Sequence, residues 1–183
     1  MFLTEEEILG TSAALNLTCD YFGQNAEMID AFFAANAQRK FTVMGCGSSY
    51  MLSKSAAAVL ASFPETAANA IPAGDYIADP AFWQDTVRGS IVLMLSRSGR
   101  TSEMVWAARK IRQSLGCPII SINAEADNDI TPMSDLELSM PWCHDNSVCQ
   151  TRTVTNLYAA ALLLAARYAK DDGLWQSVHD AAA

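Results

Sequence analysis

Short apolar runs alternate with longer alanine-rich stretches along most of the chain. Each apolar run ends at a glycine, a proline or polar residues, as is typical of buried strands. Runs of this kind occupy residues 41–45, 91–95, 118–123 and 136–140, with a weaker one at residues 68–72. Stretches with strong helix propensity follow at residues 51–62, 102–115 and 148–169. Strands that alternate with helices predict an α/β fold, with a parallel sheet covered on both faces.

The amino-terminal residues have a helical pattern instead. Thr4 and Glu7 have the spacing of a capping box, so a helix is expected to begin near Glu5. A second helix is expected over residues 26–37. The sequence also predicts a linker around residues 73–85 and a short helix or turn near residues 130–135. We find no internal repeat or shift in composition that marks a second complete domain.

Length and charge exclude several classes of protein. The 183 residues, 51% of them hydrophobic, suit one domain with a substantial core. The net charge of −8 argues against nucleic-acid binding, because phosphate neutralisation needs clustered Lys and Arg. An anionic ligand would therefore need a local site. The amino terminus lacks the order of a signal peptide, and no apolar run approaches the roughly 20 residues of a membrane span.

The cysteines indicate a reducing compartment. They are odd in number and lack the repeated spacing of a zinc site or a disulfide framework. The five positions are Cys19, Cys46, Cys117, Cys143 and Cys149. A reduced, cytoplasmic chain is expected.

Two turns rich in glycine and hydroxyl groups follow predicted strands. They are Gly45-Cys-Gly-Ser-Ser49 and Ser96-Arg-Ser-Gly-Arg-Thr101, and each leads into a predicted helix. Ligands bind at such carboxyl ends of strands in doubly wound sheets. N–H groups at a helix start carry partial positive charge, and Ser and Thr add donors, so the two turns together suit a phosphate.

These turns also fit other interpretations. In either turn taken alone, Ser and Thr would be no more than helix caps, and Gly would do no more than reverse the chain direction. Gly45 and Gly47 also begin the G-x-G-x-x-G pattern of dinucleotide-binding folds, but Tyr50 occupies the third glycine position. A P-loop is excluded because no G-K-[S/T] follows either turn.

Four segments carry a family resemblance, in this order along the chain: "EEEILGTSAAL", "GCGSSY", "LSRSGRTSE" and "DNSVCQTRTVTN". The last three resemble the motifs of the sugar isomerase domain, known as SIS. The first resembles the amino-terminal segment of the tandem proteins of that family, which include the isomerase half of glucosamine-6-phosphate synthase, tagatose-6-phosphate ketose/aldose isomerase and fructosamine-phosphate deglycases.

This resemblance implies a three-layer αβα sandwich with a five-stranded parallel sheet, flavodoxin-like in class. It implies N-terminal helices over residues 1–40, the SIS domain over 41–170, and over 171–183 a C-terminal helix or the start of a linker to a possible second SIS domain. It also implies a sugar phosphate as ligand, without metal or redox cofactor. The expected phosphate-binding residues are Gly47, Ser48, Ser49, Ser96, Arg97, Ser98 and Thr101.

The resemblance places the chemistry just before the last long helix. Aldose–ketose interconversion needs a base that moves a proton between neighbouring carbons. The family has a Glu at the position of Asp145, so Asp145 is the expected catalytic base, with a side chain one methylene shorter. Asp145 also suits a helix cap, and the two roles are compatible.

Neighbouring residues suggest weaker alternatives. His144 suggests a general acid for ring opening, but the family has no matching histidine, so an ordinary loop histidine is favoured. A metal site formed by Cys143, His144 and Cys149 lacks suitable ligand spacing. Cys46 lies within the first turn without a basic neighbour, which favours a packing role.

Two functions from different classes follow from the resemblance. The leading hypothesis is a phosphosugar isomerase or deglycase, acting on a ketose phosphate or an amino-sugar phosphate. The alternative is a phosphosugar-binding module that performs no chemistry; a basic recognition helix, which often accompanies such sensors, is not apparent. The chain is expected to be half of a tandem protein or a single-domain relative. A homodimer is expected because the helix at 148–169 and the N-terminal helices are rich in apolar residues.

Overall fold

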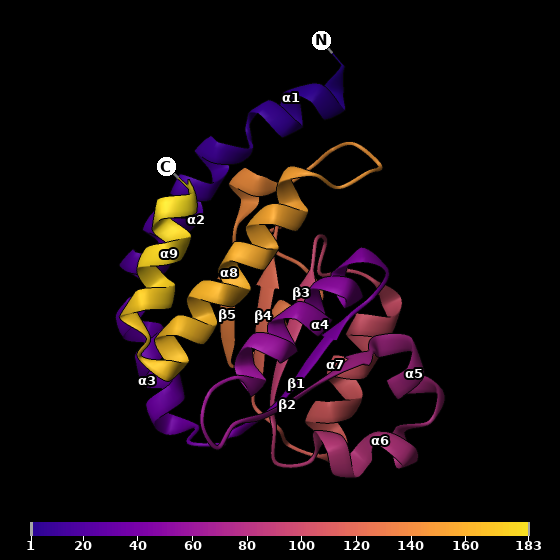
Figure 1. The fold of residues 1–183 in the computed structure, drawn as a ribbon. Coiled ribbons are helices and arrows are strands. Elements are labelled where there is room, and N and C mark those ends of the chain that lie inside the picture. Colours follow the sequence, from indigo (N-terminus) through magenta and orange to yellow (C-terminus); the bar gives the residue numbers. More distant parts are fainter. Residues whose placement is uncertain (1, 183) are drawn as a thin grey trace.

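Five parallel strands form the centre of the protein, which we describe from a computed structural model of residues 2–182. Their order in the sheet is β2-β1-β3-β4-β5 (Figure 1). The strands are β1 (Lys40–Gly45), β2 (Ala67–Pro72), β3 (Ile91–Ser96), β4 (Ile119–Asn123) and β5 (Leu136–Ser139). The predicted fold class, a three-layer α/β sandwich with a five-stranded parallel sheet, is confirmed.

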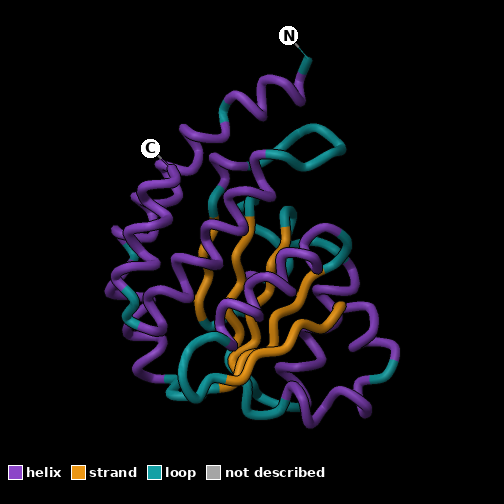
Figure 2. The backbone as a smooth tube through the Cα atoms, viewed as in Figure 1, coloured by secondary structure: helices purple, strands orange, loops and turns teal. Residues whose placement is uncertain are grey.

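Helices cover both faces of this sheet, and the strands lie between them (Figure 2). One face packs against α2 (Thr11–Gln24), α3 (Ala26–Ala35), α4 (Ser48–Ala61), α8 (Arg152–Ala169) and α9 (Asp172–Ala182). The other face packs against α5 (Ala73–Ala78), α6 (Pro80–Val87) and α7 (Ser102–Ser114). The first helix, α1 (Leu3–Leu9), extends away from the sheet at the amino terminus (Figure 1).

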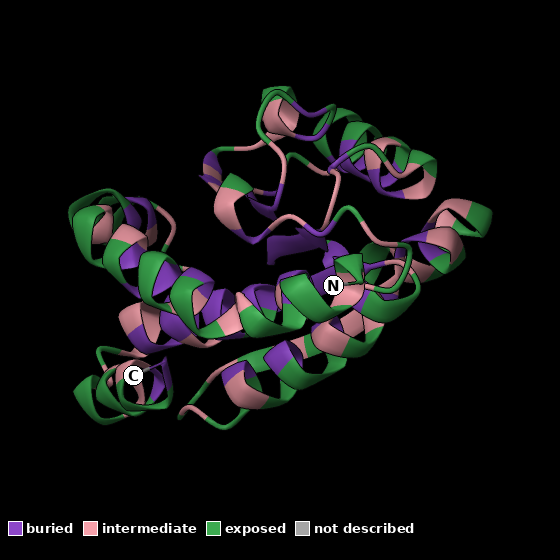
Figure 3. Ribbon diagram, turned by 90° about the horizontal axis from the view of Figure 1, so that it is seen from above, coloured by how far each residue is buried: buried purple, intermediate pink, exposed green. Residues whose placement is uncertain are grey.

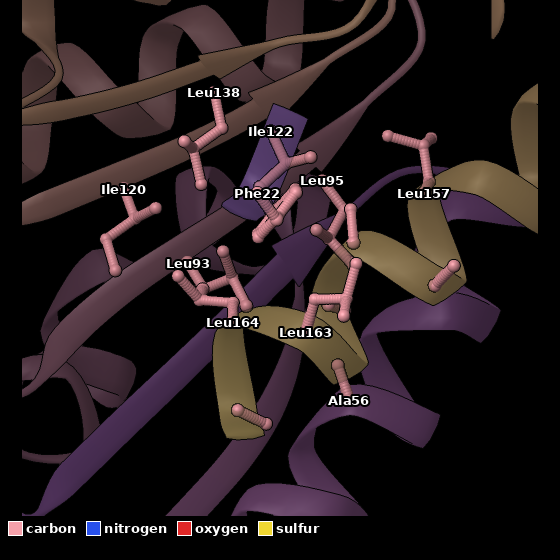
Figure 4. Packing of buried hydrophobic residues seen from close by; sticks show 14 of the residues in the cluster. Phe22, Ala56, Leu93, Leu95, Ile120, Ile122, Leu138, Leu157, Leu163 and Leu164 are labelled. Carbon is pink, nitrogen blue, oxygen red and sulfur yellow. The ribbon is translucent and has the colours of Figure 1, made fainter. Parts of the chain in front are cut away.

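The core has two parts because neighbouring strand residues point to opposite faces. Leu93 packs in the larger cluster with α8, whereas Val92 and Met94 belong to the smaller cluster with α7. Figure 4 shows side chains of the larger cluster, among them Leu163 and Leu164 of α8. Buried residues line the inner sides of the helices (Figure 3). The central strands β1, β3 and β4 are therefore buried on both sides, whereas the edge strands β2 and β5 are buried only in part.

The prediction of a linker around residues 73–85 was wrong. Two short helices, α5 and α6, occupy this stretch and bury Tyr76 and Val87 against the sheet. The Asp79 carboxylate caps α6 by accepting the N–H of Phe82 at 3.0 Å. Each helix is too short to produce a clear helical period in the sequence.

The predicted capping box of Thr4 and Glu7 was also wrong. Helix α1 begins at Leu3, and the Phe2 N–H donates to Glu5 at 3.4 Å instead. The side chain of Glu7 is buried and contacts a distant loop.

The last long helix begins later than predicted. Helix α8 starts at Arg152 and not at Val148, and residues 144–151 form a loop that projects from its amino-terminal end (Figure 2). The 3-10 turns Thr131–Met133 and Pro141–Cys143 precede β5 and this loop, respectively. Among residues 2–182, no helix has the length and hydrophobicity needed to cross a membrane.

Candidate functional site

The two hydroxyl-rich turns meet at the carboxyl ends of β1 and β3, which are neighbours in the sheet. The chain leaves β1 toward β2 on one side and leaves β3 toward β4 on the other, so the strand order reverses between them. Ligands of doubly wound sheets bind in the crevice at this reversal. The topology therefore brings both predicted turns to the expected place.

Glycines give the first turn its shape. A Cβ atom on Gly45 would lie 2.6 Å from the backbone carbon and oxygen of Ser49, so a larger residue cannot be accommodated without a shift. Gly47 has a φ of 55°, which favours glycine, and immediately precedes α4. The turn can thus bring Ser49, in the first turn of α4, close to the sheet.

Internal hydrogen bonds fix the second turn. The Ser96 hydroxyl accepts the N–H of Gly99 at 2.9 Å, and the Ser98 hydroxyl accepts the N–H of Arg100 at 3.2 Å. The Arg97 carbonyl accepts the N–H of Ala124 at 3.0 Å, which ties the turn to the end of β4. Each Ser hydroxyl can still donate its own hydrogen to a ligand.

A pocket of about 100 Å³ lies between the two turns. Five of the predicted phosphate-binding residues line it: Ser49, Ser96, Arg97, Ser98 and Thr101. Its other lining residues are Cys46, Leu95, Met104 and Gln150. The predicted residues Gly47 and Ser48 are exposed beside it and do not line it.

Gln150 was missed in the sequence, although it lies within the motif before α8. Its Oε1 atom is shielded from solvent and accepts no hydrogen bond from the residues described. A buried amide oxygen without a partner is unfavourable, so a donor on a ligand would stabilise it.

A larger hollow of about 640 Å³ lies elsewhere, near the amino ends of β1 and β2. Phe33, Phe63 and Tyr168 contribute to its wall, together with Arg39 and other side chains. Neither hydroxyl-rich turn reaches it. Size alone therefore does not identify the site, and the converging hydroxyl groups favour the smaller pocket.

Asp145 lies outside the pocket and caps α8. Its Oδ2 accepts the N–H groups of Thr151 at 2.6 Å and Thr153 at 2.9 Å. Its own N–H donates to the Thr153 hydroxyl at 2.9 Å. The carboxylate is fully buried, with Arg152 Nε 3.7 Å from Oδ1. Oδ1 has no hydrogen-bond partner among the residues described.

The residues beside Asp145 in the sequence include His144, Cys143 and Cys149. His144 Nδ1 lies 3.5 Å from Glu125 Oε1 at the end of β4. Burial raises the pKa of the Cys143 thiol to about 12, and Cys149 is exposed. In residues 2–182, no three His, Cys, Asp or Glu side chains are grouped closely enough to bind a metal. Burial also raises the pKa of Cys46, which suits packing better than reactivity.

Arg97 links the pocket to the loop before α8. Arg97 lines the pocket, and its Nη1 donates to the carbonyl of Ser147 at 3.0 Å and to that of Asp145 at 3.5 Å. Its remaining N–H groups leave it capable of binding an anion as well.

Comparisons with known proteins agree with this architecture. A family model described as the SIS domain matches residues 35–167. Tagatose-6-phosphate ketose/aldose isomerase from Escherichia coli is 21% identical, with a TM-score of 0.84, over 99% of this chain and 51% of that chain. The C-terminal domain of glucosamine-fructose-6-phosphate aminotransferase from Francisella tularensis is 16% identical, with a TM-score of 0.80. That match covers 98% of this chain and 52% of the other.

Structures of different length share the fold. A protein from Escherichia coli CFT073, solved as a complex, is 15% identical, with a TM-score of 0.72, and the match covers 98% of this chain and 100% of that one. By contrast, the chain spans about half the length of the two structures above. No curated protein sequence is significantly similar to the chain.

Proposed function

Because the chain belongs to the SIS domain family, we propose that it binds a sugar phosphate in the pocket between the two hydroxyl-rich turns. The observation that carries the proposal is the convergence of Ser49, Ser96 and Ser98 on one pocket at the ends of neighbouring strands. Helices α4 and α7 begin at this pocket, so partial positive charge adds to the hydroxyl donors. Arg97 supplies a full positive charge, which suits a phosphate dianion.

We propose a ketose phosphate or an amino-sugar phosphate as the ligand. The similar structures include a tagatose-6-phosphate isomerase and a glucosamine-6-phosphate deaminase from Thermotoga maritima. At 21% and 22% identity their substrates are a guide to the class of ligand for this chain.

The proposed reaction is that of a phosphosugar isomerase or deglycase. In the isomerase step, the base takes a proton from the hydroxyl-bearing carbon beside the carbonyl and returns it to the former carbonyl carbon, while the hydroxyl proton passes to the carbonyl oxygen, so no external oxidant or reductant is needed. Asp145 is the proposed base, and its Oδ1 without a hydrogen bond supports this role. Because the carboxylate is buried, the loop 144–151, which is closed when the phosphate binds, would have to open for the proton transfer that follows.

A second candidate function is a binding module without chemistry. The observation that favours it is the position of Asp145, which caps α8 and does not line the pocket. In such a module the phosphate site would serve a sensor or regulatory role. Proton exchange on the bound sugar distinguishes the two functions.

The experiment combines binding with exchange. Calorimetry with fructose 6-phosphate should show binding to the parent chain, and the double variant Ser49→Ala/Ser98→Ala should lose it. Ser55→Ala, on the exposed side of α4, is the matched control and should bind normally. Unchanged affinity in the double variant would contradict the proposed site.

The same sugar phosphate, incubated in deuterated water, reports on chemistry. Incorporation of deuterium at the carbon beside the carbonyl, above the rate without protein, supports the isomerase. Binding without incorporation supports the module instead.

We also propose that the protein is a cytoplasmic homodimer, with an interface on only one of the two expected surfaces, the N-terminal helices. The apolar side chains of α8, such as Leu163, are buried in the core and are not free for a partner. Exposed apolar residues lie at α1: Phe2, directly before the helix, is 85% exposed, and Leu9, at its end, is 70% exposed. A second copy that covers α1 would remove this surface from water.

A further inference from the structure

Helix α1 carries one buried carboxylate among exposed ones. Glu5 and Glu6 face solvent, whereas Glu7 is 2% exposed. Burying a charged side chain is unfavourable unless hydrogen bonds compensate for the lost water. The partners of Glu7 therefore indicate why it is there.

These partners all belong to the loop 144–151. Glu7 Oε1 accepts the N–H groups of Asn146 at 2.7 Å and Ser147 at 3.0 Å, and Oε2 accepts the Ser147 hydroxyl. The hydroxyl bond contributes most to lowering the pKa of Glu7, and Arg152 lowers it further. The loop is thus held by an ionised carboxylate at neutral pH. Figure 1 shows α1 and this loop extending from the same end of the molecule.

Ser147 is also held by a residue of the pocket. The Ser147 carbonyl accepts a hydrogen bond from Arg97, which lines the pocket. Gln150, three residues further along the loop, lines the pocket as well. Ser147 therefore lies between Glu7 of the first helix and Arg97 of the second hydroxyl-rich turn.

We propose that Glu7 is a positioning residue for the sugar-phosphate site. It fixes the loop 144–151 so that Arg97 and Gln150 keep their places at the pocket. Glu7 does not touch the pocket itself, so it acts through the loop. The inference rests on the proposed function, because it assumes that the pocket binds phosphate.

A structural role alone, in which Glu7 only attaches α1 to the domain, makes different predictions. It predicts that loss of Glu7 leaves phosphate affinity unchanged as long as the domain is folded. A positioning role predicts that the effect on affinity depends on Gln150. A double-mutant cycle measures this dependence directly.

The test titrates the full chain with inorganic phosphate and uses Glu7→Ala, Glu7→Gln and Gln150→Ala. Glu7→Ala should weaken binding by about tenfold, in line with the loss of hydrogen bonds to a charged group. Glu7→Gln should retain most of the parental affinity, because the amide oxygen can still accept the N–H groups of Asn146 and Ser147. Glu6→Ala, the exposed neighbour, is the control and should bind as the parent does.

Two further readouts complete the test: the double-mutant cycle separates positioning from attachment, and hydrogen exchange checks that Glu7 holds the loop. In the Gln150→Ala background, Glu7→Ala should cause a smaller loss of affinity than in the parent, because only the part that acts through Arg97 remains. Amide hydrogen exchange at residues 146 and 147 should become faster in Glu7→Ala and remain slow in Glu7→Gln. Parental affinity in Glu7→Ala, or fully additive effects in the double variant, would overturn the inference alone. A parent chain that binds no phosphate would contradict the proposed function as well.

Discussion

Replacing Asp145 by alanine should destabilise the domain, and the structure allows the size of the effect to be estimated. The substitution removes two hydrogen bonds from the N–H groups of Thr151 and Thr153, which are left without their acceptor. Loss of a helix cap costs about 0.5–2 kcal/mol, and a hydrogen bond to a charged group contributes about 1.5–3 kcal/mol. Removal of a buried charge offsets part of this loss. We expect a net decrease in the free energy of unfolding of about 2–4 kcal/mol.

Urea unfolding measures this change. Asp145→Asn keeps an oxygen that can accept the N–H groups, so it should lose about 1 kcal/mol. Asp20→Ala removes an exposed carboxylate on α2 and should change stability by about 0.5 kcal/mol or less. If Asp145→Ala were as stable as Asp20→Ala, the cap described here would not form in solution.

The asparagine variant also tests the proposed chemistry. It remains folded but cannot accept the substrate proton, so deuterium exchange on a bound sugar phosphate should fall by about a hundredfold to ten-thousandfold. An unchanged exchange rate would leave Asp145 as a cap and require another base. Asp145→Glu restores the side chain of the family, and higher activity would indicate that Asp145 is a shortened base.

Two more predictions concern the first turn and the helix α1. Gly45→Ala places a Cβ against the backbone of Ser49, so it should lower the free energy of unfolding by about 1–3 kcal/mol and weaken phosphate binding. Gly23→Ala, with no atom near the added methyl group, should be neutral or stabilising. Equal stability of the two variants would contradict the close contact at Gly45. Sedimentation at micromolar concentration should show a dimer that dissociates when Phe2 and Leu9 are both replaced by Ser; a parent that is monomeric throughout would contradict the proposed interface.

Much of the fold could be predicted because the central strands β1, β3 and β4 are buried on both faces. A strand such as β3, with every residue buried, leaves a continuous apolar run in the sequence. The short helices α5 and α6 leave no such signal. These helices contact the sheet through single residues such as Tyr76 and Val87. Which residues make these contacts is decided by tertiary packing and not by a local sequence pattern.

The candidate site could be predicted in part for a related reason. Ser49 and Ser98 each follow a strand in a local glycine motif, and parallel strands bring such motifs to one edge of the sheet. The contact of Glu7 with Asn146 joins residues 139 positions apart, so no local sequence pattern predicts it. Likewise, the motif before α8 contains both Asp145 and Gln150, but only the folded loop determines which of them lines the pocket.

A titration of the isotope-labelled protein with fructose 6-phosphate, followed by the backbone amide signals, tests the central claim most directly. The largest shifts should occur at Ser49, Ser98 and Thr101, with smaller ones at Gln150, and Ser49→Ala/Ser98→Ala should remove them. Shifts confined to the larger hollow, around Phe33 and residues near it, would contradict the assignment of the phosphate site.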